Sequence, residues 1–330
     1  MNSTPLQRST LRLAITLCSV TFPLLLLGGI VHPTGSSLAC PDWPTCYGSL
    51  FPEHLAAIDT QLRIEHTHRV IAFIVGLLAL ALALSLSIAW RGPGIDIRRI
   101  RRLGWVAALL VLFQGILGGA TVLLGLSPIV SSFHFTVSML FFLTGLALCH
   151  ALIDLVRGKP SRPPPPVDSS RLQKWGFILT LVVYAQMILG AFVRHTGAGY
   201  ACGETIPLCL GHFWPAHWPG QLQMVHRLLG VGLFIATLRI AQIAISAVRP
   251  SLLTRLSLSL PILCLCQLTI GSITVISRIG LIEVTIHLAV GIMMLAISYT
   301  IYNRSKSSTV AIAPTTQTAV NSPSALPEAI

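Results

Sequence analysis

Histidine is the residue type whose placement suggests chemistry in this sequence. Of the 11 histidines, all except His150 lie in or beside the connections on one side of the long apolar segments. Two of them, His68 and His134, fall at similar depth near the ends of two such segments. His226 and His287 repeat that arrangement in the second half of the chain. Ionisable groups within apolar segments usually face a cavity or a cofactor. Two facing imidazoles at one depth suit the axial positions of a haem inserted between helices.

An internal repeat strengthens this interpretation of the histidines. Residues 28–35 lead to Cys40 and Cys46, and the similar stretch 192–197 leads to Cys202 and Cys209. Gln114 precedes His134 by 20 positions, and Gln267 precedes His287 by 20 positions. The repeat predicts two halves of the same orientation, related by an axis along the membrane normal. A lone intramembrane histidine is usually a hydrogen-bonded core residue, but duplication of both members of a pair favours ligands. Zinc is disfavoured, because no segment has the close His and Cys spacing of a tetrahedral site.

The two halves differ at one acidic position. Three residues before His68, on the same helical face, the first half has Glu65, whereas the second half has Gln223 before His226. A carboxyl group near a buried cofactor can hold or deliver a proton, and an amide cannot. We therefore assign chemistry to the first-half site, and storage or relay of electrons to the second.

Other polar residues flank these histidines. His66 is an alternative ligand in the first half, and alignment of the two halves selects His68 as the counterpart of His226. Arg69 and Arg227 follow the selected histidines at the water boundary, where they suit haem carboxylates or, equally, act as interfacial arginines.

Four cysteines pair by position in the connections on the oxidising side. A disulfide is expected within each pair, Cys40 with Cys46 and Cys202 with Cys209, either structural or redox-active. The remaining cysteines are expected to act as small apolar residues: Cys18, Cys149, Cys264 and Cys266. Solvated acidic side chains are expected at Asp42, Glu53, Asp59 and Glu204, and interfacial anchors at Trp43, Trp214 and Trp218.

Composition identifies the elements that must position these residues. The 330 residues are 53% hydrophobic and 10% charged, with a mean hydropathy of +0.78, which excludes a soluble globular enzyme. Apolar runs of about 20 residues match the thickness of a bilayer. We predict an all-α integral membrane protein with eight transmembrane helices forming two pseudo-symmetric four-helix bundles. The expected spans are 11–31, 67–90, 103–125, 131–153, 172–194, 223–248, 252–276 and 281–303.

Charge placement predicts the orientation. The net charge of +12 includes 22 Lys and Arg, and 17 of these lie on the side of the termini. By the positive-inside rule the N- and C-termini are cytoplasmic. The net charge therefore reports topology, and nucleic acid is not an expected partner. A secretory signal or lipoprotein cleavage before Cys40 is disfavoured, because the first apolar run is long and seven more follow.

The expected organisation has four parts. Residues 1–158 form the first four-helix half, with the site to which chemistry is assigned, and residues 159–170 form a Pro-rich cytoplasmic linker. Residues 171–303 form the second half, with the electron-relay site, and 304–330 form a disordered tail.

The residues now described closely resemble one known family. Residues 65–69, His134, residues 226–227, His287 and the two cysteine pairs, over roughly 10–303, are similar to haem A synthases of cytochrome oxidase maturation. The resemblance implies a bacterial inner-membrane oxidoreductase that converts the C8 methyl group of haem O to a formyl group by successive hydroxylations. It implies that His226 and His287 ligate a resident haem b, and that His68 and His134 ligate the substrate haem. It also implies that Glu65 is the catalytic carboxylate.

The resemblance implies partners as well. These are membrane lipid, haem O with the protohaem farnesyltransferase that makes it, and an electron acceptor that the sequence does not identify; a homo-oligomer is left open. One alternative is a b-type transmembrane electron-transfer cytochrome, which the single cytoplasmic-side histidine, His150, disfavours. A haem transporter is the other alternative; Gln114 and Gln267 are the one polar pair that could serve it.

Overall fold

The computed structural model describes residues 3–50, 59–90, 95–157, 169–246 and 251–306, and within these ranges it is all-helical, without any strand longer than an isolated bridge. The long helices are α1 (Pro5–Val31), α2 (Thr60–Ala89), α3 (Ile95–Leu123), α4 (Pro128–Arg157), α5 (Ser169–His195), α6 (Trp218–Ile245), α7 (Leu252–Ile276) and α8 (Leu281–Ser305). Two short 3₁₀ turns, η1 (Ser36–Leu38) and η3 (Ala198–Tyr200), follow α1 and α5.

All eight helices are long and apolar enough to cross a membrane, which confirms the predicted fold class. Several helices begin before the predicted spans. Helix α2 begins at Thr60, where the predicted span began at residue 67, and α6 begins at Trp218, where the predicted span began at residue 223. Asp59 caps α2 by accepting a hydrogen bond from the Gln61 backbone N–H, so a polar first turn precedes the apolar run. This extension places the candidate site residues of α2 inside the helix, not at its first residue.

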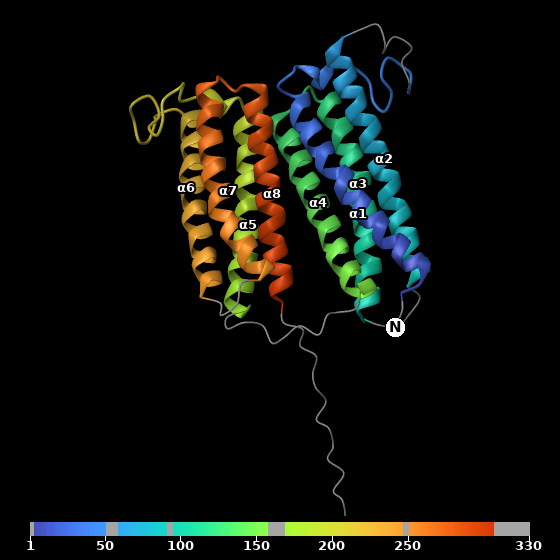
Figure 1. Cartoon of the computed structure of the whole chain (residues 1–330). Helices are drawn as coiled ribbons and strands as arrows, with labels where there is room; N and C mark the ends of the chain where they lie inside the picture. Colours follow the sequence, from blue (N-terminus) through green and yellow to red (C-terminus); the bar gives the residue numbers. More distant parts are fainter. Residues whose placement is uncertain (1–2, 51–58, 91–94, 158–168, 247–250, 307–330) are drawn as a thin grey trace, which may run out of the picture.

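Each half of the chain forms a ring of four helices (Figure 1). In the first half α1 packs against α2 and α4, and α3 packs against the same two helices; in the second half α5 packs against α6 and α8, and α7 does likewise. The halves meet where α1 and α4 lie beside α5 and α8. Helices α2 and α4 are thus diagonal partners across one bundle, as are α6 and α8 across the other.

Polar contacts join the two halves in addition to apolar packing. The Arg304 guanidinium of α8 lies 2.6 Å from the Asp154 carboxylate of α4, and the Tyr184 hydroxyl of α5 donates to the Thr136 carbonyl of α4. Met139 and Phe142 of α4 belong to the buried apolar cluster of the second half. The halves therefore form one packed unit.

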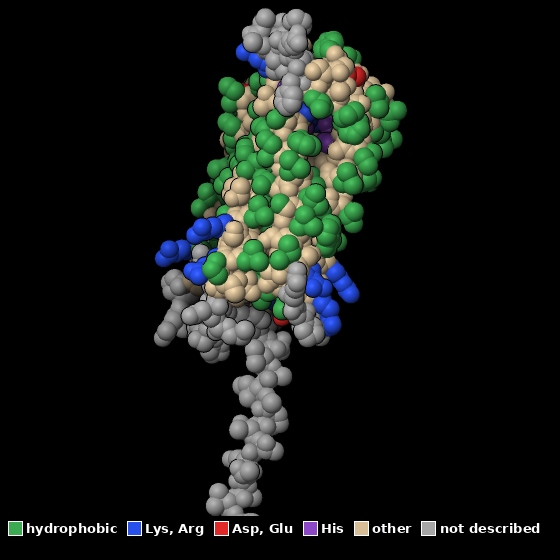
Figure 2. Space-filling model, turned by 90° about the vertical axis from the view of Figure 1, so that its right-hand side faces the viewer, with side chains coloured by type: hydrophobic (Ala, Val, Ile, Leu, Met, Phe, Trp, Pro, Cys, Tyr) green, Lys and Arg blue, Asp and Glu red, His purple; other side chains and the backbone are tan. Residues whose placement is uncertain are grey.

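The surface fits a bilayer. Figure 2 shows apolar side chains over the middle of one face, with Lys and Arg concentrated toward the end at which α1 begins. Nearer the opposite end the face is hollowed, and histidine side chains are visible in the hollow (Figure 2). Residues 159–168 of the predicted linker and 307–330 of the predicted tail lie outside the described residues.

Candidate functional site

One large cavity of about 1720 Å³ lies between the helices and extends into both halves. Its walls are mostly apolar, and the four repeated histidines His68, His134, His226 and His287 all line it. Glu65 is the only Asp or Glu among the described residues that line it. A cavity of this size, apolar with few polar groups, is typical of a site for a large lipophilic ligand.

The histidines face each other across the bundles. His68 on α2 and His134 on α4 lie on diagonal helices of the first bundle, and both line the cavity. His226 on α6 and His287 on α8 stand in the same relation. The structure therefore brings together the two pairs that the repeat defined.

A glycine on the preceding helix makes room for each imidazole. A Cβ atom added at Gly28, Gly190 or Gly271 would lie 3.0 Å from the ring of His68, His226 or His287, respectively, and one added at Gly118 would lie 3.3 Å from His134. Contacts between carbon atoms are normally about 3.5–4.0 Å. Any other residue at these four positions would push the ring, so the glycines fix where each imidazole lies.

Glutamine side chains hold two of the rings. Gln114 Nε2 donates to the His134 carbonyl at 2.8 Å and lies 3.0 Å from His134 Nδ1; Gln186 Nε2 makes the same contacts with His226, at 2.8 and 3.2 Å. Gln267 lies at the corresponding place on α7, before His287. Sequence reasoning missed Gln186 and the glycines, although the spacing Gln-x-x-x-Gly at 114–118, 186–190 and 267–271 was a readable signal.

Buried polar atoms at the cavity test whether a haem fits. Among the described residues, Oε1 of Gln114, Gln186 and Gln267 and Nδ1 of His287 are buried without a hydrogen-bond partner. Such orphaned atoms are costly unless a ligand or a shift satisfies them. Together with paired imidazoles and glycine clearances, they fit a flat group held edge-on between helices, with a histidine on each face.

Glu65 lies between the cavity and the outer loop. Its Oε2 accepts a hydrogen bond of 2.8 Å from the Cys40 backbone N–H, and its Oε1 lies 2.5 Å from Nη2 of Arg69. Gln223 makes the equivalent bond to the Cys202 N–H at 3.0 Å. The backbone contact is thus common to both halves, and the ionisable carboxyl group is what distinguishes the first.

The two arginines hold the disulfide loops. Arg69 donates to the carbonyls of Cys40, Asp42 and Thr45, and Arg227 donates to those of Thr205, Pro207 and Leu208. Within the described part of the chain, Arg227 Nη2 remains buried without a partner. That nitrogen is available to a ligand carboxylate, whereas both terminal nitrogens of Arg69 are already engaged.

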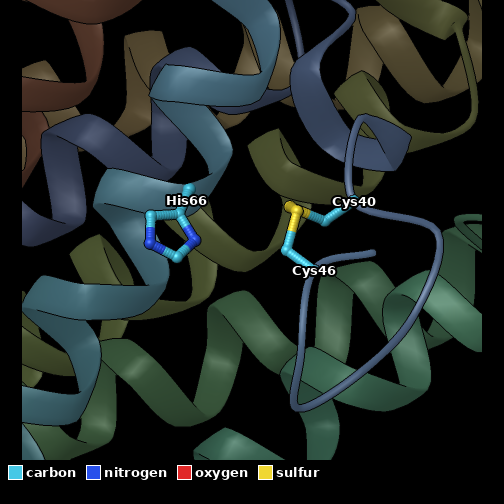
Figure 3. Close-up of side chains that lie close together, drawn as sticks. All are labelled: Cys40, Cys46 and His66. Carbon is cyan, nitrogen blue, oxygen red and sulfur yellow. A yellow bond between two sulfur atoms is a disulfide. The ribbon is translucent and has the colours of Figure 1, made fainter. Parts of the chain in front are cut away.

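Both expected disulfides are present, Cys40 with Cys46 and Cys202 with Cys209, and all four cysteines are buried. Figure 3 shows the His66 ring beside the first disulfide, and the ligand atoms of the three residues lie within 4.8 Å of one another. In the second half Met224 takes the place of His66 against the disulfide. Sulfurs joined to each other cannot also serve as thiolate ligands, and their burial shields them from an external thiol.

Three loop residues have roles that the sequence analysis did not predict. The Asp42 carboxylate accepts bonds from Thr45, the Tyr47 N–H and the Gly48 N–H, and the bond from the Thr45 side chain is the main reason that its pKa lies below the ordinary value. The Arg278 side chain likewise lowers the pKa of Glu204, with a contact of 2.8 Å. Trp43, expected as an interfacial anchor, lines the cavity and packs on Gly119 of α3. Asp42 and Glu204 thus fix the loops by polar contacts, and Trp43 contributes to the cavity wall.

Fold and site together define a multi-pass membrane protein with paired histidines in a buried cavity. The chain matches the COX15-CtaA family, described as cytochrome oxidase assembly protein, over residues 11–299, and it belongs to that family. It is 34% identical to a haem A synthase of Exiguobacterium sibiricum over 238 residues, 71% of this chain and 75% of that protein. It is 30% identical to the haem A synthase of Geobacillus kaustophilus over 271 residues, 80% of this chain and 81% of the relative. The predicted family resemblance is confirmed.

Proposed function

We propose that this protein is a haem A synthase, an oxidoreductase that converts the C8 methyl group of haem O to a formyl group by successive hydroxylations. The observation that carries the proposal is the pair of opposed histidine sites, each ring set against a glycine, in one cavity of a chain from this family. A haem b bound at the second site would supply one-electron transfer, since no side chain can accept the electrons removed from a methyl group.

The second half is the resident site in this proposal. His226 and His287 hold haem b, as the family resemblance implies; both rings are set by glycines, and Gln186 contacts His226. The buried Arg227 Nη2, which has no partner among the described residues, would bind a carboxylate of the haem. This half has no carboxylate among the described lining residues, so it binds and relays electrons without handling protons.

The first half is the reaction site. His68 and His134 hold haem O, and the apolar walls keep water away from the reacting methyl group. Glu65 takes up protons that leave the methyl carbon, because it is the one described carboxylate of the cavity. Arg69 and the Cys40 N–H each hold one oxygen of this carboxyl group in place. Both disulfides are structural in this scheme.

The cellular location and the reaction partners are proposed from the topology and from the chemistry of the substrate. We place the protein in the bacterial cell membrane with cytoplasmic termini, from the basic residues on that side. Haem O is lipophilic and reaches the site from the enzyme that attaches its farnesyl chain, and an electron acceptor reoxidises haem b. An electron-transfer cytochrome is disfavoured, because His150 at the other end is bound to Thr300 and no second histidine joins it among the described residues.

The test uses the internal repeat as its control. Glu65→Gln installs the residue that the second half carries, and Gln223 shows that an amide keeps the bond to the cysteine backbone. We expect this variant to bind haem but to form no haem A when extracted pigments are separated by chromatography, while Gln223→Glu retains activity. Normal haem A in Glu65→Gln would refute the role of this carboxylate.

The assignment of the two sites is tested separately. His226→Ala or His287→Ala should remove the resident haem b spectrum, and His68→Ala should leave it. Loss of the spectrum in His68→Ala alone would reverse the assignment of the halves.

A further inference from the structure

The four cavity histidines differ in how their rings are held. On α3, α5 and α7 a glutamine lies four residues before the glycine that faces the ring, which is one helical turn away on the same face of the helix. These residues are Gln114, Gln186 and Gln267. On α1 the corresponding residue is Leu24, four residues before Gly28; it is buried and, like His68, lines the cavity. An apolar side chain cannot donate to the ring or to the carbonyl of His68.

The ring of His68 is also turned differently. At Gly118, Gly190 and Gly271 the imidazole presents Cε1 and then Nδ1 to the glycine. At Gly28 the His68 ring presents Nε2, at 3.0 Å, and then Cδ2, at 3.6 Å. A rotation of 180° about the Cβ–Cγ bond exchanges the Cε1–Nδ1 edge of an imidazole with its Nε2–Cδ2 edge. The His68 ring therefore packs against its glycine in the opposite orientation to the other three rings.

No hydrogen bond restrains the His68 ring in the part of the chain that the structure describes. By contrast, Gln114 holds His134 and Gln186 holds His226 by two contacts each. Nδ1 of His287 also lacks a partner among the described residues, but Gln267 stands one turn before the glycine that faces it, where α1 has Leu24. Ligand atoms of haem sites are normally oriented by such outer partners, and loss of one typically lowers metal affinity 10- to 100-fold.

We infer that Leu24 makes His68 the exchangeable ligand of the first-half haem, so that this iron opens one axial position while His134 stays bound. The inference rests on the proposed function, since it assumes that these histidines ligate haem. It supplies what a reacting haem needs, because an iron with two fixed histidines has no place for a small reactant. Leu24 is a positioning residue here, acting only through His68.

Carbon monoxide binding tests the inference directly. The purified full chain is loaded with two equivalents of ferric protohaem, reduced with dithionite and exposed to carbon monoxide, which binds ferrous haem only where an axial position opens. We expect one of the two haems to bind carbon monoxide in the wild type. Leu24→Gln should lower the affinity of that haem for carbon monoxide about tenfold, the effect of one added hydrogen bond. Leu24→Met, of similar size without an amide, should behave as the wild type.

The reciprocal variant uses the other half. Gln186→Leu removes the restraint on His226, and we expect the second haem to bind carbon monoxide as well. In His68→Ala the first haem should remain, held by His134, and bind carbon monoxide at least as fast as in the wild type. Leu24→Gln with the wild-type affinity, or a wild type in which neither or both haems respond, would overturn the inference. Absence of haem from both sites in the wild type would instead refute the proposed function.

Discussion

Gly190→Ala is the sharpest test of how the second-half site is built. The added Cβ atom would lie 3.0 Å from Cε1 of His226. Because ordinary contacts begin at about 3.4 Å, the ring must move by a few tenths of an ångström. Functional groups need placement within about 0.5 Å, so the shift approaches the limit that a ligand site tolerates. The same shift strains the bond between His226 and Gln186.

The expected result is a loss of haem without a loss of fold. Displacement of an oriented ligand should lower haem affinity about 10- to 100-fold, measured by titration of the purified chain with ferric protohaem. Replacing glycine by alanine in a helix otherwise stabilises the helix by about 1 kcal/mol. The melting temperature of the haem-free variant should therefore not fall to match the loss of haem affinity. Gly118→Ala, whose Cβ would meet His134 at 3.3 Å, should show a smaller effect at the first site.

Gly232→Ala on α6 is the matched control. A Cβ atom at this position meets nothing within 4 Å, so haem affinity should stay at the wild-type value. If Gly190→Ala binds haem as tightly as Gly232→Ala does, the glycine does not position His226 and the reasoning fails.

Three further predictions follow from the cavity and its loops. Gly76 lines the cavity with open space around it, so Gly76→Leu should fill part of the first-half site and lower haem O binding while the haem b spectrum persists; unchanged haem O binding would contradict this. Arg278 lowers the pKa of Glu204 below its ordinary 4.5, so the pair stabilises the fold above that value and the effect disappears as pH falls through the lowered pKa. The difference in melting temperature between wild type and Glu204→Gln should therefore shrink on acidification, and a difference that grows would refute it. Replacing Cys202 and Cys209 by serine should cost about 2–4 kcal/mol in unfolding free energy, with haem binding weakened and not abolished.

The sequence alone predicted the eight spans and the grouping of the four histidines. Eight apolar runs of bilayer length are compatible with few folds other than a bundle of transmembrane helices. The duplicated histidines at matched depth then define which histidine pairs with which. Helix starts were wrong by about two turns at α2, because hydropathy detects the apolar run but not the polar first turn capped by Asp59.

The restraints on the rings were not predicted. Glycine clearance depends on how closely two helices approach, and a single sequence does not give that distance. The contacts of Arg69 were missed for a similar reason, since its partners are backbone carbonyls of a loop whose path is fixed by the Cys40–Cys46 disulfide. Backbone carbonyls carry no signature in the residue types.

Three differences between the halves lie around one histidine. Around His68 the first half has a carboxyl group at Glu65, an imidazole at His66 and an apolar residue at Leu24, where the second half has Gln223, Met224 and Gln186. His134 keeps its glutamine contact, and these three differences lie on α1 and α2. Random drift between two repeats would scatter such changes over all four rings. Their concentration at His68 supports the proposed division of labour, in which one haem would stay coordinated to pass electrons and the other would exchange a ligand beside Glu65.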